Sequence, residues 1–148
     1  MTCQRILFVC LGNICRSPLA QGIFEKRAQD IGQADAFSFD SAGTGAWHVG
    51  NPPDPRSIDI ARVHGIDISS QRARQIVRSD LEDFDVILAM DSNNLANLNR
   101  MAPVGPVARI ELLFQSPARD VPDPYYGGDG GFNTVFRMIR ERSEEILR

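Results

Sequence analysis

The stretch Arg5-Ile6-Leu7-Phe8-Val9-Cys10-Leu11-Gly12-Asn13-Ile14-Cys15-Arg16-Ser17-Pro18 decides the fold of this chain. Residues 5–9 form a compact, mostly apolar run, which is typical of a strand buried on both faces of a parallel sheet. Ser17 suits the capping residue of a helix, and Pro18 suits the first helical position. We therefore predict a strand at 5–9, a loop at 10–16, and a helix that continues to about Ile31.

Strand and helix signals alternate through the rest of the chain. A continuous apolar run predicts a strand at 86–90, and further strands are predicted at 37–40, which is short, and at 107–110, where the signal is weaker. Alternation of this kind favours one α/β domain over residues 1–148, with a four-stranded parallel sheet and helices on both faces. A helix is expected near 55–64, and a short helix should start at 79–82, where Ser79 and Glu82 have capping-box spacing. Another helix should run from Asp91 or Ser92 to before Pro103. The last helix is expected where Val135, Ile139 and Ile146 share one face.

The composition excludes several classes of protein. The 148 residues are 43% apolar and 24% charged, with a net charge of −3, so nothing supports nucleic-acid binding. No apolar run is long enough to span a bilayer. The run at 6–9 is also too short for the apolar region of a signal peptide, so the expected compartment is the cytoplasm.

The three cysteines, Cys3, Cys10 and Cys15, cluster at one end of the chain. An odd number in this arrangement is not a disulfide framework. The two histidines, His48 and His64, lack the spacing to complete a zinc site with them. We expect no metal and no cofactor, and a clustered cysteine in a reducing compartment indicates catalytic or redox chemistry.

Residues 10–16 have the features of an anion site. A loop between a strand and a helix N-terminus can turn backbone N–H groups inward, and Gly12 permits the bend. The guanidinium of Arg16 matches two phosphate oxygens. The positive field favours the thiolate of Cys10, to which Ser17 can donate a hydrogen bond, and a thiolate beneath a phosphoryl group is a nucleophile. The alternative is an inert buried cysteine with Arg16 on the surface.

These residues resemble the Cys-x5-Arg-Ser signature of low-molecular-weight protein tyrosine phosphatases, and the resemblance extends along nearly the whole chain. It implies a phosphate-binding loop after the first strand, with Leu11, Gly12, Asn13, Ile14, Cys15 and Ser17 among the phosphate- and substrate-binding residues. The other matching segments are 40–42, 51–54, 73–75, 90–91 and 123–127.

The second catalytic candidate is a general acid. A leaving phenolate needs a proton as its bond to phosphorus breaks. Asp123 lies between two prolines, which stiffen its loop, but the residues alone do not favour it over Asp120 or Asp91. The resemblance selects Asp123, and implies that the same carboxylate later activates water to hydrolyse a phosphocysteine intermediate.

The resemblance also implies supporting roles. Asn13 and Ser41 would brace the loop, although ordinary turn chemistry explains them equally well. Many members carry a histidine before the Ala-Arg-Gln run, where this chain has Gln71. Aromatic walls suit a planar phenyl ring, so Trp47 and Tyr125 are expected at the sides of the slot, with Leu11 and Ile14 in its throat.

Cys15 has two interpretations. It is either a small core residue or the partner of Cys10 in a reversible disulfide that prevents irreversible oxidation, and the resemblance favours the second. The implied substrate is a phosphotyrosine protein, and a tyrosine kinase is among the partners that the resemblance suggests.

Three alternative functions remain at this point. Arsenate reductases on the same fold relay a disulfide through further cysteines, and this chain has none after Cys15. Protein-arginine phosphatases of the family carry Thr at the position of Ile14, where an aliphatic side chain favours a phenyl ring. A non-catalytic phosphotyrosine-binding module would not need Cys10, Arg16 and Asp123 together.

Overall fold

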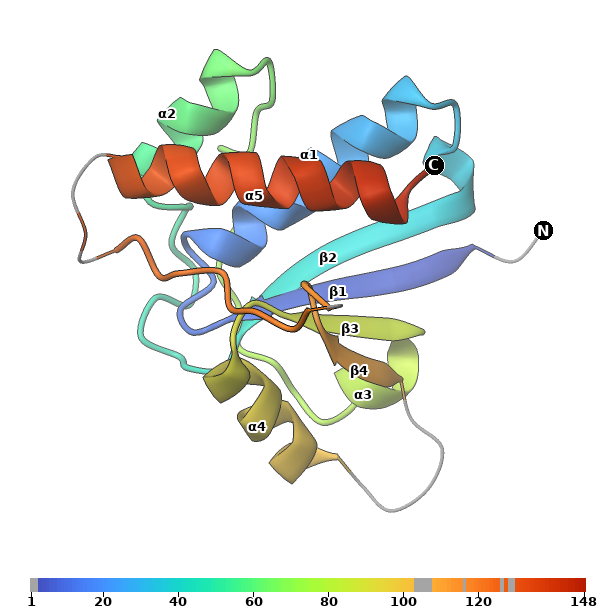
Figure 1. The fold of residues 1–148 in the computed structure, drawn as a ribbon. Coiled ribbons are helices and arrows are strands. Elements are labelled where there is room, and N and C mark those ends of the chain that lie inside the picture. The colour runs from blue at the N-terminus through green and yellow to red at the C-terminus, as the bar shows by residue number, and fades with distance from the viewer. Residues whose placement is uncertain (1–2, 103–107, 116, 126, 128–129) are drawn as a thin grey trace.

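The computed structural model describes residues 3–102, 108–115, 117–125, 127 and 130–148. Four parallel strands form one sheet in the order β2-β1-β3-β4 (Figure 1). The strands are β1 (Gln4–Cys10), β2 (Phe37–Gly43), β3 (Val86–Ala89) and β4 (Arg109–Leu112).

The central strand β1 ends at the nucleophile candidate. Alternate side chains of β1 enter two different cores, because successive residues of a strand point to opposite faces. Ile6, Phe8 and Cys10 join one apolar cluster, whereas Leu7 and Val9 join the other. The loop after β1 therefore lies at the carboxyl edge of the sheet, where parallel sheets bind ligands.

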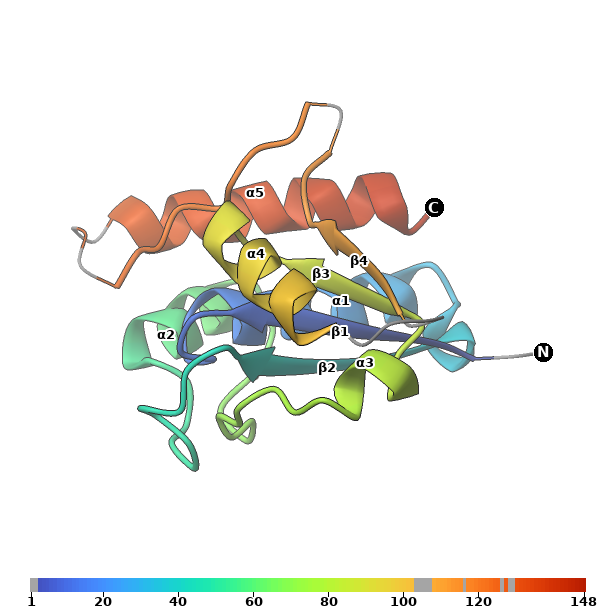
Figure 2. The ribbon, with the colours of Figure 1, turned by 90° about the horizontal axis from the view of Figure 1, so that it is seen from below.

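Helices cover both faces of the sheet. Helices α1 (Arg16–Asp30), α2 (Pro55–Val63) and α5 (Gly130–Ile146) pack on one face, and α3 (Asp80–Asp83) and α4 (Ser92–Met101) lie on the other (Figures 1 and 2). A short 3-10 turn, η1 (Ala34–Ala36), precedes β2. This arrangement confirms the predicted fold class.

Several predicted element ends need correction. Helix α1 begins at Arg16, and the capping position belongs to Cys15, so Ser17 is not the cap. Strand β2 extends three residues beyond Asp40, because parallel pairing with β1 continues to Gly43. Strand β4 begins at Arg109 and ends at Leu112, two residues later than predicted; Val107, where its predicted start fell, lies outside the described residues.

Two helix caps also differ in their chemistry. A short helix, α3, begins directly after Ser79, as predicted, but the Ser79 side chain makes no capping hydrogen bond. Asp54 and Asp91 instead cap α2 and α4, where their carboxylates accept from the N–H groups of Arg56 and Asn94. Within the described part of the chain, no helix has the length and apolar content needed to cross a membrane.

Candidate active site

The loop from Cys10 to Arg16 turns its carbonyl groups outward. Thr44 N donates to Cys10 O over 2.9 Å, and Gly45 N donates to Leu11 O over 2.9 Å. At the other end of the loop, Asp54 N donates to Ile14 O over 2.8 Å. When carbonyl groups face outward, the N–H groups between them are free to face inward, which is the geometry of an anion nest.

The close approach that these bonds require depends on a glycine after β2. A Cβ atom on Gly43 would lie 2.8 Å from Leu11 O and 3.1 Å from Asn13 N. Both are backbone atoms and cannot rotate away. Gly43 therefore allows the end of β2 to lie directly against the loop.

Cys10 Sγ accepts hydrogen bonds at the base of this loop. The backbone N–H of Asn13 donates to the sulfur over 3.2 Å, and Ser17 Oγ lies 3.0 Å from it. Asn13 Nδ2 donates to Ser17 Oγ over 2.8 Å, and the Ser17 hydroxyl can also donate to Ala42 O over 3.5 Å.

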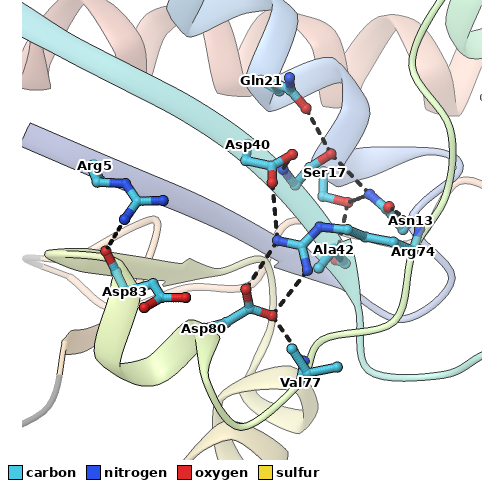
Figure 3. A network of polar contacts seen from close by, with 11 residues as sticks. Arg5, Asn13, Ser17, Gln21, Asp40, Ala42, Arg74, Val77, Asp80 and Asp83 are labelled. Carbon is cyan, nitrogen blue, oxygen red and sulfur yellow. Dashed lines mark hydrogen bonds and ion pairs between the residues drawn. The ribbon is translucent and has the colours of Figure 1, made fainter.

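Asn13 connects the loop to the rest of the fold. It has a positive φ of 57°, and its side chain donates to Ser41 Oγ over 3.0 Å as well as to Ser17. Its Oδ1 accepts from the backbone N–H of Arg74 over 2.9 Å. Ser41 Oγ in turn donates to Gln21 Oε1 over 2.8 Å. Figure 3 shows this chain of polar contacts between the loop, α1 and β2.

Arg74 itself is held by two carboxylates (Figure 3). Its guanidinium contacts Asp80 at 3.0 and 3.2 Å and Asp40 at 3.0 Å. Burial lowers the pKa of the Arg74 guanidinium, but the hydrogen bonds and charges of Asp80 and Asp40 together outweigh it and raise the pKa overall. The residue whose backbone N–H donates to Asn13, Arg74, is thus anchored by a charged network outside the pocket.

Arg16 is almost completely buried, with 2% of its side chain exposed. Its Nη1 donates to Asp91 Oδ2 over 2.6 Å and to Val121 O over 2.9 Å, and its Nη2 lies 3.6 Å from Asp123 Oδ2. Burial lowers the pKa of Arg16, but the charges of Cys10 and Asp91 raise it above its ordinary value. The interpretation of Arg16 as a surface residue is therefore wrong.

A cavity of about 370 Å³ opens above Cys10. Trp47 and Tyr125 stand at its mouth, and the side chain of Trp47 is 72% exposed, so it is not a core tryptophan. The lining residues are Cys10, Leu11, Gly12, Ile14, Cys15, Trp47, His48, Asp123 and Tyr125.

This fold has counterparts among known proteins over almost its full length. The family model for "Low molecular weight phosphotyrosine protein phosphatase" matches residues 5–148. The chain belongs to this family. A Schizosaccharomyces pombe relative with the same name is 44% identical over 149 residues, which cover 97% of this chain and 95% of the relative.

Solved structures of family members agree with this assignment. YfkJ from Bacillus subtilis is 42% identical, with a TM-score of 0.91 over 99% of this chain and 94% of that one. DARP, described as a Drosophila arginine phosphatase, is 37% identical, with a TM-score of 0.89 over 96% of this chain and 94% of that one. The low-molecular-weight phosphatases are protein-tyrosine phosphatases, and this chain is an enzyme of that class, acting on phosphotyrosine in proteins.

The structure separates the predicted loop residues into two groups. Leu11, Gly12, Ile14 and Cys15 line the cavity, as expected for residues that contact substrate. Asn13 and Ser17 are 3% and 0% exposed and lie behind the loop, where they brace it. Ser41 lies behind the loop too, through its bond to Asn13.

Gln71 contacts the start of α1 and not the loop itself. Its Nε2 donates to Pro18 O over 3.2 Å, while its Oε1 is buried without a partner among the described residues. The side chain therefore supports the first turn of α1 with one of its two polar ends. Tyr126, which completes the Asp-Pro-Tyr-Tyr motif, lies outside the described residues.

His48 and Arg56 had no predicted role in the site, and Asp91 was considered only as a general acid and a helix cap. His48 lines the cavity, with its ring centroid 6.2 Å from that of Tyr125. Asp91 contacts Arg16, and Arg56 donates to Tyr125 O over 3.2 Å while it forms a bidentate pair with Asp54. The pairing of Asp91 with Arg16 had no local signal, because the two residues are 75 positions apart in the chain.

Proposed function

We propose that Cys10 attacks the phosphorus of phosphotyrosine and forms a phosphocysteine. The proposal rests on one observation: Cys10 Sγ receives the Asn13 N–H and the Ser17 hydroxyl at the base of a loop whose carbonyls face outward. Three non-bridging oxygens of the phosphate would occupy this nest, with the Arg16 guanidinium compensating the charge that develops on them.

Asp123 completes the proposed reaction. Its carboxyl group lines the cavity and is oriented by the N–H of Tyr125, which donates to Oδ1 over 3.0 Å. In the first step, the S–P bond forms, the P–O bond to tyrosine breaks, and the Asp123 proton goes to the leaving oxygen. In the second step, the Asp123 carboxylate takes a proton from water, whose oxygen attacks phosphorus and releases Cys10 and inorganic phosphate.

The apolar lining supports an aryl ester as the substrate. Leu11 and Ile14 form the throat, and Trp47 and Tyr125 can lie against a ring that enters between them. A guanidinium would leave its N–H groups without acceptors against Ile14, which disfavours a protein-arginine phosphatase. Comparison of phosphotyrosine and phosphoarginine peptides of one sequence would test this choice.

The remaining proposals concern the setting of the enzyme. The family match over residues 5–148 supports one phosphatase domain across the chain. All three cysteines are free, and a thiolate nucleophile needs reducing surroundings, which supports a cytoplasmic location. The family resemblance supports protein substrates with a tyrosine kinase among them, and the net charge of −3 gives no support to nucleic-acid binding.

The decisive experiment traps the intermediate. Acid quenching during turnover of a phosphotyrosine peptide should leave phosphate on the peptide that contains Cys10, detected by mass spectrometry. Cys10→Ser should abolish turnover and still bind inorganic phosphate, whereas the matched variant Cys15→Ser should keep its activity within tenfold. Turnover by Cys10→Ser within tenfold of the parent would exclude the covalent mechanism.

A further inference from the structure

A second hollow of about 440 Å³ adjoins the catalytic cavity. Leu11 and Trp47 line both hollows and form a wall that the two share. The Trp47 ring packs so closely on Gly45 that a Cβ atom at that glycine would overlap it.

Two arginines line the second hollow, and they come from different segments of the chain. Arg78 lies in the segment before α3, and Arg100 lies in the last turn of α4. Both are exposed, and within the described ranges neither has a carboxylate within the 4.0 Å of an ion pair. Arg100 donates only to the side-chain oxygen of Asn97, a neutral partner on the same helix.

The arginines around the catalytic cavity, in contrast, form ion pairs with carboxylates. Arg16, Arg56 and Arg74 are each paired with at least one carboxylate of this chain, at 2.6 to 3.0 Å. Two guanidinium groups without such partners, in a protein of net charge −3, leave a local positive field at the rim of the active site. An anion from outside the chain would complement it.

We propose that this hollow, formed by Leu11, Trp47, Arg78, Arg100 and Met101, binds a negatively charged side chain of the phosphotyrosine substrate. The proposal rests on the tyrosine phosphatase function. A substrate tyrosine that enters the first cavity along Trp47 brings the neighbouring residues of its peptide across the shared wall. A carboxylate or a second phosphate can then meet the guanidinium groups, with its methylene carbons against Trp47 and Met101.

The size of the effect follows from the exposure of the two arginines. Exposed charge pairs contribute little each and are screened by salt, so two of them should favour an acidic peptide by roughly 3- to 10-fold. Because the contact lies away from the reacting atoms, it should lower KM and leave kcat nearly unchanged. Raising the ionic strength should weaken the preference.

The test compares phosphotyrosine peptides that carry Glu, phosphoserine or Gln at one position, scanned from three residues before the tyrosine to three after. For the parent, kcat/KM should be roughly 3- to 10-fold higher with an acidic residue at one or two positions than with Gln. In the double variant Arg78→Gln/Arg100→Gln, the preference should fall below about twofold. The Glu and phosphoserine peptides distinguish the two sources of negative charge.

A matched double variant separates local from overall charge. Arg62→Gln/Arg137→Gln removes two exposed arginines, on α2 and α5, that do not line either cavity. This variant should keep the peptide preference, and both double variants should hydrolyse p-nitrophenyl phosphate like the parent. The proposal is wrong if the parent shows no acidic preference, if the Arg78/Arg100 variant keeps it, or if the control variant loses it.

Failure of the phosphatase function would be recognised separately. A parent protein without activity on p-nitrophenyl phosphate would contradict the proposed function directly. The hollow would then be tested by peptide binding. The affinities of the same peptides would be measured for the Cys10→Ser variant and for the triple variant Cys10→Ser/Arg78→Gln/Arg100→Gln. Equal affinity of acidic and neutral peptides for the first of these would reject the subsite.

Discussion

Arg16 Nη1 and Asp91 Oδ2 lie 2.6 Å apart, although 75 residues separate them in the chain. The same carboxylate caps α4, since its Oδ1 accepts from Asn94 N over 2.8 Å. Asp91 thus fixes the Arg16 guanidinium, which we propose binds phosphate, to the start of a helix on the opposite face of the sheet from α1. It acts through Arg16 and is a positioning residue.

The substitution Asp91→Asn separates these two roles. Asparagine caps helices well, but it removes the charge that holds Arg16. We expect kcat on phosphotyrosine to fall about tenfold and the free energy of unfolding by about 1–3 kcal/mol, the usual cost of a hydrogen bond to a charged group. Asp91→Ala should lose about 1 kcal/mol more with the cap. Reduced stability with an unchanged kcat would assign Asp91 a structural role only.

Asp123→Ala should reveal the general acid by its dependence on the leaving group. We expect kcat on phosphotyrosine to fall by about 10²- to 10⁴-fold, the range of general acid–base catalysis. The loss should be smaller for esters of more acidic phenols, while formation of the phosphoenzyme limits the rate, because these leave without a proton. The limb of the pH–rate profile that reports the protonated carboxyl should disappear.

Asp120 serves as the control for Asp123, and it also has a structural role. Its Oδ1 accepts from Ser92 N over 3.0 Å and from Ser92 Oγ over 2.8 Å, which ties its loop to the start of α4. Asp120→Asn should therefore affect stability more than leaving-group dependence. If Asp120→Asn shows that dependence and Asp123→Ala does not, the proton donor has been assigned to the wrong residue.

Asn13 is expected to hold the phosphate loop in its active shape. Asn13→Gly keeps the positive φ but loses three side-chain hydrogen bonds, which should cost about 2–4 kcal/mol in urea unfolding. Asn13→Ala should cost about 1 kcal/mol more, because alanine is strained at a φ of 57°. Equal stability of the two variants would show that the backbone relaxes and that φ is not constrained there.

The raised pKa of the Cys15 thiol predicts a loss of stability at high pH. Burial raises the pKa of its thiol from 9.0 to about 12, with the charges of Asp54 and Cys10 adding to the shift. The unfolded chain therefore ionises first, so the free energy of unfolding should fall as pH rises from about 9 towards 12, by about 2 kcal/mol at pH 10.5. Thermal melts of the parent and of Cys15→Ser should diverge over this range, and parallel curves would contradict the shift.

The redox role of Cys15 is tested with peroxide. Peroxide oxidises Cys10 to a sulfenic acid, whose sulfur the Cys15 thiol can attack; the S–S bond forms as the S–OH bond breaks, and the hydroxyl leaves as water. Mild peroxide should inactivate the parent, and a thiol reductant should restore it. Cys15→Ser should recover less, because Cys10 then advances to sulfinic acid. Equal recovery of both proteins would leave Cys15 with a packing role alone.

The sequence by itself determined β1, the loop after it and the helix that follows, because an apolar run and helix-start residues act over a few neighbours. The order of strands and helices specified the parallel sheet for the same reason. The signature Cys10 to Ser17, together with the Asp123 motif, identified the family that the comparisons confirm. Here local chemistry and spacing were sufficient.

Only the tertiary structure decided the contacts that make the loop work. Ser17 looked like a helix cap, yet it lies within α1 with its hydroxyl at Cys10, because the helix starts two residues earlier than its cap signal indicates. Asp91 and Arg74 reach the site from distant segments, and no local pattern records the partner that a buried charge will find. Such pairs form where folding brings the ends of different strands to the same edge of the sheet. Which residues pair therefore depends on the packed molecule.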